Sequence, residues 1–383
     1  MPKKVLMFAG PVHPIPPIKG AAVESWIYEV SKRVISFEPH IVSIGDIYYP
    51  ESEYKNGIYF HRINFSPLYR RIFQKMTKLD PLSYPKRVLK IINKIKPDIV
   101  HIHNTYKWAL PVIEKLDKNI KIVLHFHNEI NIDKENQVDA FIGCSQFIVE
   151  IYKKNNKLKA KHYKCIYNGV DLSKYRPYWE IPELRRSIRE RFKIKENEFI
   201  VLFIGRVSPE KGVEHFVNTA IRLKNVKNIR FFIVGEISKK GERANYAKEI
   251  LKKITSYKDK IIFTDVFPPF KMPLIYLIGD IVFSPSNFEE PFSMVNIEAM
   301  ATGLPVITRA KGGVKEYIKN GINGFFVREE KIDEDASELI VNLYQNERLR
   351  KTIGENARDT VKKFDWFYIV EELEKFYMEL LTK

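Results

Sequence analysis

Two glutamates that stand eight positions apart, Glu290 and Glu298, flank a short apolar run with helical spacing. Pro291 and Ser293 precede this run, and serine is a preferred N-cap residue. Main-chain N–H groups at a helix start attract phosphate, and carboxylates accept hydrogen bonds from hydroxyl groups. This spacing therefore predicts a site for a ligand that is part phosphate and part sugar.

Two cations follow an apolar run at 199–204 that is typical of a buried strand. Arg206 comes after Gly205 at the end of this run, and Lys211 directly precedes the next helical stretch. Two fixed cations and a helix N-terminus can hold a diphosphate without a metal ion and stabilise it as a leaving group. The alternative interpretation is a solvated loop with incidental charges, which the nearby glutamate pair makes weaker.

Short apolar runs alternate with helical stretches along the whole chain, which predicts an α/β protein with two doubly wound parallel sheets facing a central cleft. The irregular segment after Asn168-Gly169-Val170-Asp171 places the boundary near residue 172, so the expected domains are 1–172 and 173–365. No strand follows the last helical stretch, within 366–383, and we expect it to pack back on the first domain. The expected strands are 5–9, 40–44, 99–103, 121–125, 140–143 and 165–167, then 199–204, 229–234, 261–263, 281–284, 306–308 and 324–327.

The net charge of +17 is unevenly distributed. Residues 55–96 hold 11 Lys/Arg against the single acid Asp80. Within this segment, residues 67–79 have the apolar periodicity of an amphipathic helix, with basic residues mostly off the apolar face. Such a helix suits an anionic membrane surface or an anionic acceptor. The alternative is a surface helix that packs its apolar face on its own domain. No nucleic-acid recognition module accompanies the charge, so nucleic acid is not an expected partner. The basic residues of this helix are Arg70, Arg71, Lys75 and Lys78.

The apolar run at the N-terminus is too short for a signal peptide, and no stretch approaches the roughly 20 apolar residues that span a bilayer. Only Cys144 and Cys165 occur, without metal-type spacing. A reducing cytosol, with possible attachment to the inner face of the cell membrane, is therefore the expected location.

Four histidines form two alternating pairs, His101 with His103 and His125 with His127. Alternation places both rings of a pair on one face of a strand. A zinc cluster is one interpretation, but no cysteine or carboxylate pattern completes it, so we expect no metal site. Buried core positions are the commoner outcome for His101 and His125, whereas His127 ends its strand where ligands bind.

The sequence resembles the GT-B-fold retaining glycosyltransferases of family 4, also called group 1 glycosyltransferases, over nearly its full length. The resemblance rests on Gly205-Arg206-Val207-Ser208-Pro209-Glu210-Lys211-Gly212, on Glu290 and Glu298 with the following Ala299-Met300-Ala301-Thr302-Gly303-Leu304-Pro305, on Gly312-Gly313 with Glu316, on Asn320-Gly321-Ile322-Asn323-Gly324 and on Asn168-Gly169-Val170-Asp171. The wording Pro-Pro-Ile-Lys-Gly near residue 20 is similar to members linked to spore-coat and surface-polysaccharide synthesis.

This resemblance implies a role for each matching residue. Glu290 would contact the hydroxyls of the donor sugar, Glu298 the nucleotide ribose, and Arg206 with Lys211 the diphosphate. The main chain from Pro291 through Phe292, Ser293 and Met294 to Val295 would complete the phosphate cradle, and Gly20 with Ala21 would approach it from the first domain. His127 would contact the donor sugar or the reacting centre. Ser293 and Ala21 depart from the family, which often has glycine at both positions.

Together with the charged groups of the site, this resemblance implies a metal-independent, retaining hexosyltransferase that needs no cofactor. It would move a sugar from a nucleotide-diphosphate donor, with a UDP-sugar favoured. The acceptor would be a hydroxyl of a sugar, a lipid-linked or another small acceptor in the synthesis of cell-surface polysaccharide or glycoconjugate. Lys211→Ala should abolish turnover with little effect on folding. The alternatives are a nucleotide-sugar 2-epimerase, which shares the two-domain architecture, and a non-catalytic protein that binds sugar nucleotides or polyanions.

Overall fold

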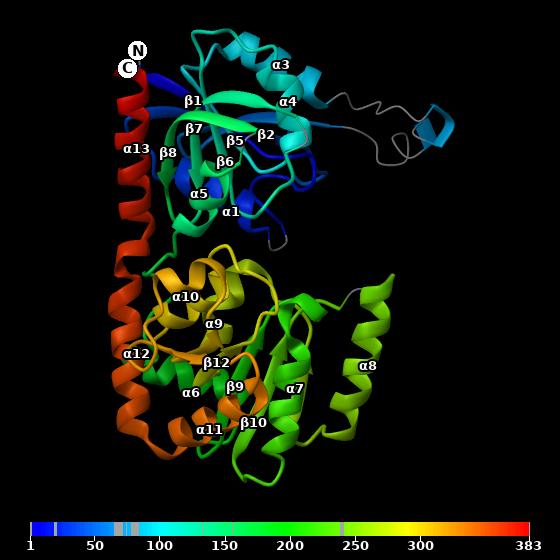
Figure 1. Cartoon of the computed structure of the whole chain (residues 1–383), viewed down its shortest axis with the longest axis vertical. Coiled ribbons are helices and arrows are strands. Elements are labelled where there is room, and N and C mark those ends of the chain that lie inside the picture. Colours follow the sequence, from blue (N-terminus) through cyan, green and yellow to red (C-terminus); the bar gives the residue numbers. More distant parts are fainter. Residues whose placement is uncertain are drawn as a thin grey trace. The chain divides into compact units, whose positions relative to one another are not determined.

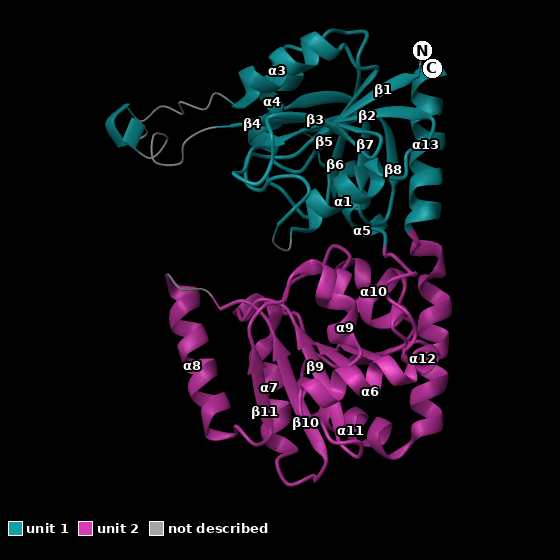
Figure 2. Cartoon of the chain, turned by 180° about the vertical axis from the view of Figure 1, so that it is seen from behind, with its two compact units in different colours: residues 1–169, 366–383 teal, residues 170–365 magenta. Residues whose placement is uncertain are grey.

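The computed structural model describes residues 2–18, 21–64, 72–73, 75–77, 84–132, 134–155, 157–237 and 241–382. It divides into two compact units, which Figure 2 colours separately. Unit 1 comprises Met1–Gly169 with Trp366–Lys383, and unit 2 comprises Val170–Asp365. The boundary after residue 169 lies three residues before the predicted one, and the final helix belongs to unit 1.

Unit 1 contains an eight-stranded sheet in the order β3-β4-β2-β1-β5-β6-β7-β8. The β3–β4 pair is antiparallel and the other described pairs are parallel. Figure 1 labels β1, β2 and β5 to β8 of this sheet. Its central strands are continuous apolar runs because helices cover both faces of a parallel sheet. The strands are β1 (Lys3–Phe8), β2 (Phe37–Ile44), β3 (Ser52–Lys55), β4 (Ile58–Ile63), β5 (Ile99–His103), β6 (Lys121–Phe126), β7 (Asn136–Gly143) and β8 (Leu158–Cys165).

The described helices of unit 1 are α1 (Ala22–Ser31), α3 (Tyr84–Ile95), α4 (Tyr106–Ile113), α5 (Gln146–Lys153) and α13 (Trp366–Thr382). Helices α1 and α13 bury their apolar sides in one core cluster with β1, β5 and β7. Trp26 of α1 meets Trp366 of α13 with ring centroids 6.4 Å apart. The C-terminal helix therefore completes the core of unit 1, although more than 190 residues separate it from the rest of that unit.

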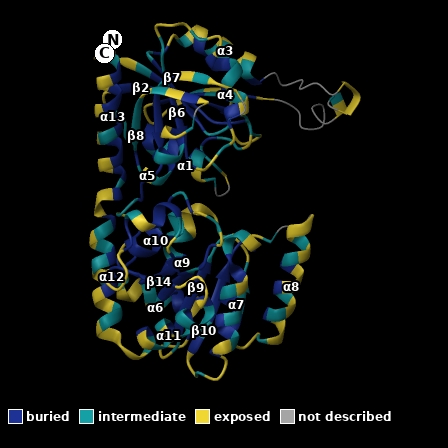
Figure 3. Cartoon of the chain, viewed as in Figure 1, coloured by how far each residue is buried: buried dark blue, intermediate teal, exposed yellow. Residues whose placement is uncertain are grey.

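Unit 2 contains a six-stranded, fully parallel sheet in the order β11-β10-β9-β12-β13-β14. Alternate residues of its strands share one core cluster with α7, α8 and α11, and Figure 3 shows β9 and β10 as buried. The strands are β9 (Phe199–Ile204), β10 (Ile229–Val234), β11 (Ile261–Thr264), β12 (Ile281–Ser284), β13 (Val306–Arg309) and β14 (Phe325–Val327). The helices are α6 (Pro182–Arg191), α7 (Val213–Arg222), α8 (Glu242–Ser256), α9 (Met272–Tyr276), α10 (Met294–Ala301), α11 (Ile332–Gln345) and α12 (Glu347–Val361).

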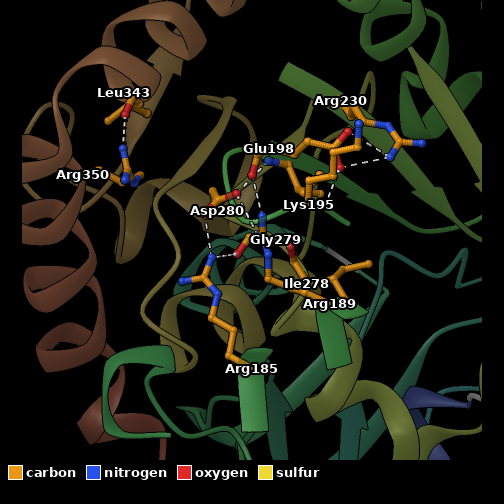
Figure 4. A network of polar contacts seen from close by, with 11 residues as sticks. Arg185, Arg189, Lys195, Glu198, Arg230, Ile278, Gly279, Asp280, Leu343 and Arg350 are labelled. Carbon is orange, nitrogen blue, oxygen red and sulfur yellow. Dashed lines mark hydrogen bonds and ion pairs between the residues drawn. The ribbon is translucent and has the colours of Figure 1, made fainter. Parts of the chain in front are cut away.

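Asp280, directly before β12, ties helix α6 to the start of the sheet (Figure 4). Its carboxylate accepts hydrogen bonds from the Ile200 main-chain N–H at 2.7 Å, from Arg185 at 2.6 Å and from Arg189 at 3.2 Å. Arg189 also donates to the main-chain oxygen of Ile278 at 2.9 Å. Because these charges satisfy one another, the network stabilises the amino-terminal edge of this sheet.

The structure confirms the two predicted parallel sheets and corrects three strands. Strands β3 and β4 were not predicted, and the strand predicted at 165–167 is instead β8, which spans Leu158–Cys165. Strands β3 and β8 lie at the two edges of the sheet, and most of their residues are exposed or half-buried. Such strands lack the apolar run by which buried strands are recognised. In the part of the chain that the structure describes, no helix is long and apolar enough to cross a membrane.

Candidate functional site

The strand order of unit 2 reverses at β9, which lies between β10 and β12. The loops that leave the carboxyl ends of β9 and β12 are therefore neighbours at a switch point, where open α/β sheets bind ligands. Asn287 joins the two loops. Its main-chain N–H donates to the main-chain oxygen of Glu210 at 2.8 Å, and its side-chain amide donates to the main-chain oxygen of Pro209 at 2.7 Å. Both predicted site segments thus meet at one place in unit 2.

Gly212 allows these loops to pack closely. Its φ is +67°, and a Cβ atom at this position would lie 1.9 Å from the main-chain oxygen of Pro285. Only glycine combines this backbone conformation with so close an approach. The glycine therefore holds the loop that carries Lys211 against the loop that carries Glu290.

Lys211 and Glu290 form an ion pair at the centre of the site. The Lys211 Nζ donates to Glu290 Oε1 at 2.7 Å, and the Ser286 hydroxyl donates to the same oxygen at 2.6 Å. The ammonium also lies 4.6 Å from the ring centroid of Phe288. Glu290 is only 6% exposed, so these two donors replace the water that would otherwise solvate its carboxylate. The sequence placed both residues in one site but gave no indication that they pair.

Arg206 is the more accessible cation of the site. Gly205, just before it, donates its N–H to the Val234 oxygen at 3.0 Å, which fixes the end of β9. The Arg206 side chain is 53% exposed, and its guanidinium lies 3.9 Å from the carboxylate of Glu210. An exposed guanidinium with one distant carboxylate can engage an anionic ligand at little cost.

Helix α10 begins beside the ion pair, with Ser293 at its N-cap as predicted. The Ser293 side chain makes no capping hydrogen bond, and its backbone is left-handed, with φ at 63° and ψ at 88°. The Gly313 N–H donates to the main-chain oxygen of Glu290 at 2.8 Å, and this hydrogen bond fixes the loop just before the helix. Pro291, Met294 and Val295 are half-buried, whereas Phe292 is 1% exposed.

The left-handed backbone of Ser293 predicts that glycine would stabilise this position. The strain costs a non-glycine residue about 1–2 kcal/mol, and the larger chain entropy that glycine loses on folding offsets part of the gain. We expect Ser293→Gly to raise the free energy of unfolding by about 0.5–1 kcal/mol, measured as an increase in Tm. Ser337→Gly, inside helix α11, is the matched control and should lower Tm. A lower Tm for Ser293→Gly as well would refute the strain at this site.

Glu298 lies inside α10, half-buried, and its carboxylate accepts a 2.8 Å hydrogen bond from the Tyr276 hydroxyl. Burial raises the pKa of Glu298 to about 7, and hydrogen bonds from the hydroxyls of Tyr276 and Tyr175 oppose this rise. The carboxyl group therefore changes its charge near neutral pH. Its position on the helix that starts at the switch point suits a group that accepts hydrogen bonds from ligand hydroxyls.

The raised pKa of Glu298 predicts a pH-dependent effect on stability. A carboxyl whose folded pKa exceeds its unfolded value of 4.5 favours the folded state below pH 4.5, and this contribution disappears as the pH rises through 7. The glutamine of Glu298→Gln cannot ionise, so the variant does not lose this stability. Between pH 5 and pH 8 its free energy of unfolding, relative to that of the parent protein, should therefore increase by up to about 3 kcal/mol. Thermal unfolding at both pH values measures this change, with exposed Glu196→Gln as control. A Tm difference that does not depend on pH would contradict it.

His127 of unit 1 follows β6 and has both ring nitrogens engaged. Its Nδ1 lies 3.0 Å from Asn168 Oδ1, and its Nε2 lies 3.1 Å from His103 Nδ1. Its main-chain N–H donates to Asn104 Oδ1 at 2.8 Å. Burial lowers the pKa of His127 to about 4, so the ring is neutral at physiological pH. A ligand could use this ring only by displacing Asn168 or His103.

His101 and His125 are fully buried, as expected for core positions, and His103 is fully buried as well. Their potential ligand nitrogens all lie within 4.8 Å of one another, close enough for a metal centre to be considered. The group includes no carboxylate or thiolate that would offset the charge of a cation. Burial holds the pKa of each ring well below its usual value, so the rings are neutral. Within the described structure, His101 Nε2 and both nitrogens of His125 have no hydrogen-bond partner. The four rings instead pack around Trp26, with centroids 4.8–5.7 Å from it.

The remaining predicted residues are only partly described. Ala21 is the N-cap of α1, whereas Gly20 lies outside the described residues. In the basic helix, Lys75 is exposed. The other three members of that set, Arg70, Arg71 and Lys78, also lie outside the described residues.

A cavity of about 850 Å³ lies at the opposite, amino-terminal edge of the unit 2 sheet. It is lined by the Asp280 network of Figure 4, including Arg185, Arg189 and Glu198. The charged groups of that network are paired with one another and with main-chain carbonyls. The carboxyl edge instead carries the exposed Arg206 guanidinium and the start of α10, which suit a phosphate ligand.

Four contacts in and around these sites had not been anticipated: those of Asn287, Ser286, Tyr276 and Asn168. Asn168 could have been found from the sequence, because it belongs to the motif Asn168-Gly169-Val170-Asp171. That motif was interpreted only as the end of the first domain. The other three form hydrogen bonds between segments 4 to 78 residues apart. Single polar residues of this kind have no periodicity or spacing that would identify them.

Comparison with known proteins identifies the family of this chain. Residues 185–360 match the family described as Glycosyl transferases group 1, and residues 23–174 match Glycosyltransferase Family 4. The chain is 32% identical to lipopolysaccharide 1,2-N-acetylglucosaminetransferase of Salmonella typhimurium over 98% of each chain. It is 26% identical to spore coat protein SA of Bacillus subtilis over 98% of this chain and 99% of the relative.

Among solved structures, HepE from Anabaena, in a complex with UDP-glucose, superposes with a TM-score of 0.76 at 20% identity, covering 98% of this chain and 99% of HepE. This likeness confirms the GT-B fold. The chain belongs to the group 1 glycosyltransferases.

Proposed function

We propose that this protein transfers a hexosyl group from a UDP-sugar to an acceptor hydroxyl, with retention at the anomeric carbon and without a metal ion. The observation that carries the proposal is the Lys211–Glu290 pair beside the start of α10 at the unit 2 switch point. The complex of HepE with UDP-glucose supports a nucleotide-sugar donor. The lipopolysaccharide enzyme of Salmonella supports an acceptor in cell-surface polysaccharide synthesis.

In this proposal Lys211 binds the diphosphate without releasing Glu290, because an ammonium group has three donors and only one is used in the ion pair. Arg206 supplies the second cation, and the free N–H groups at the start of α10 supply neutral donors. Together they stabilise the negative charge that develops on the leaving diphosphate, which is the role that a divalent cation would otherwise fill. No metal or other cofactor is then required.

The two glutamates are proposed to accept hydrogen bonds from donor hydroxyls, Glu290 from the sugar and Glu298 from the ribose. Neither is proposed as a nucleophile, because Glu290 is already held by Lys211 and Ser286. Retention would then follow from attack on the same face that the diphosphate leaves, with the leaving phosphate accepting the proton of the acceptor hydroxyl. His127 would orient the donor sugar or the acceptor after exchanging one of its present hydrogen bonds.

The stereochemistry can be tested by proton NMR. The enzyme is incubated with α-linked UDP-glucose or UDP-N-acetylglucosamine, EDTA and simple methyl glycosides as minimal acceptors. An α-linked product with equimolar UDP supports the proposal, whereas a β-linked product would refute retention. An epimerised nucleotide sugar would identify a 2-epimerase. A complete dependence on added Mg²⁺ would refute metal independence.

We also propose that unit 1 attaches to an anionic membrane surface at the cytoplasmic face through its basic segment 55–96. Helix α3 supports this interaction because its exposed residues are basic apart from Asn93. Each Lys or Arg near an anionic bilayer contributes about 1 kcal/mol to binding. The basic residues of this face are Lys86, Arg87, Lys90 and Lys94.

Replacing these four basic residues with glutamine is expected to weaken binding to phosphatidylglycerol vesicles by at least about tenfold. Co-sedimentation measures the bound fraction, with phosphatidylcholine vesicles as the uncharged comparison. The matched control replaces four exposed lysines of unit 2, Lys224, Lys227, Lys252 and Lys258, and changes the net charge equally. Equal losses in both variants would show a general charge effect instead of a membrane-binding face.

A further inference from the structure

Tyr317 is a buried residue whose hydroxyl lies beneath the start of α10. It is 2% exposed, and its hydroxyl donates to the main-chain oxygen of Phe292 at 2.6 Å. The side-chain amide of Asn296, in the first turn of the helix, donates to the same hydroxyl at 3.4 Å. The rings of Tyr317 and Phe292 meet edge to face at 5.4 Å. The Ser293 side chain also hydrogen-bonds with this hydroxyl, so Ser293→Gly removes that contact together with the backbone strain. One phenol thus contacts Phe292, Ser293 and Asn296 at the helix start.

The bond to the Phe292 oxygen determines where the next N–H group points. In a planar trans peptide the carbonyl and the N–H of the same unit point in opposite directions. Because the Phe292 carbonyl points to a buried hydroxyl, the Ser293 N–H points away from it. Among the described residues, no acceptor receives a hydrogen bond from this N–H. The group is therefore available to a ligand at the start of the helix.

Ser293 itself opposes this orientation. Its φ of 63° is unfavourable for a residue with a side chain. Rotating the peptide between Phe292 and Ser293 by half a turn would bring that φ to a negative, relaxed value, and would turn the N–H toward the core. The hydrogen bond from Tyr317 prevents this rotation.

We propose that Tyr317 is a positioning residue that aims the Ser293 amide at the phosphate of the donor. The inference rests on the proposed function, in which a nucleotide-sugar diphosphate binds at the start of α10. Tyr317 belongs to the segment that follows Gly312-Gly313, and the inference gives this segment a role. The Gly313 N–H at its start donates to the main-chain oxygen of Glu290, in the loop before α10. This segment supports the phosphate site from behind and does not touch the ligand.

Isothermal titration calorimetry with UDP tests the inference in four proteins: the parent, Tyr317→Phe, Ser293→Gly and the double variant. Tyr317→Phe keeps the ring and is expected to weaken UDP binding about tenfold, since one buried hydrogen bond is lost and the amide can turn away. Glycine accepts both signs of φ and removes the drive to rotate. The double variant should therefore bind within about threefold of Ser293→Gly.

Tyr317→Phe that binds UDP within twofold of the parent would overturn the inference. A tenfold loss that persists in the glycine background would also overturn it, because the hydroxyl would then act independently of the strained backbone. Tyr344→Phe, a ring that contacts Phe199, is the control and should change nothing.

Amide hydrogen exchange gives a second readout that needs no nucleotide. In the ligand-free protein Tyr317→Phe should speed exchange within residues 290–297, and unchanged exchange there would contradict the inference even if the protein bound no UDP. Absence of UDP binding in the parent protein, with faster exchange in the variant, would instead refute the proposed donor and leave the positioning role intact.

Discussion

Lys211→Met is expected to lower kcat/KM for the nucleotide-sugar donor by about a hundredfold to a thousandfold. The ammonium group would stabilise the charge that accumulates on the departing diphosphate, and removing one such donor from a preorganised site typically has an effect of this size. Initial rates of UDP release at low donor concentration measure the change. A variant that keeps the kcat/KM of the parent would remove Lys211 from the diphosphate site.

The structure also changes what this substitution should do to folding. The sequence alone suggested little effect, but Lys211 is the partner of the buried Glu290 carboxylate. Removing one member of a buried pair typically costs about 3–5 kcal/mol because the other charge is left uncompensated. The double variant Lys211→Met with Glu290→Gln should recover most of that stability without recovering activity. Recovery of activity together with stability would mean that the single variant was inactive only because it was misfolded.

Asp280→Ala is expected to destabilise unit 2 by about 3 kcal/mol, a decrease of roughly 10 °C in its Tm. The substitution leaves Arg185 and Arg189, whose side chains are 15% and 10% exposed, without their carboxylate. It also leaves the Ile200 N–H without its acceptor. Differential scanning calorimetry measures the unfolding transition of unit 2.

Arg186→Ala is the matched control for Asp280→Ala. Arg186 belongs to the same helix, but its ion pair with Glu190 is 75% and 65% exposed and should contribute little. Similar Tm values for the two variants would show that the Asp280 network is not needed for stability. A large decrease only for Asp280→Ala would show that α6 is anchored through this one carboxylate.

The sequence was most informative where its pattern was dense. The buried strand 199–204 was recognised with its observed bounds because six consecutive apolar residues have few alternatives in an α/β chain. The position of Ser293 at a helix N-cap and the pairing of two site loops also followed from residue type and order. Strands β3 and β8 were missed or misplaced because edge strands face solvent and carry polar residues.

The finer features of the site could not have been predicted from the sequence. Whether Lys211 meets Glu290 depends on a loop approach that Gly212 permits, across 79 positions of the chain. The left-handed backbone of Ser293 is set by packing, since serine itself disfavours it. The raised pKa of Glu298 depends on burial, which residue type does not reveal. These properties arise from tertiary contacts.

Unit 2 is proposed to bind a nucleoside diphosphate through Arg206 and Lys211 without a metal ion. Calorimetric titration of the full chain with UDP in the presence of EDTA tests it most directly, with the Lys211→Met, Glu290→Gln variant as the folded comparison. We expect one site per chain in the parent and binding at least about a hundredfold weaker in the variant. Equal binding by both proteins, or binding by the parent only after Mg²⁺ is added, would contradict it.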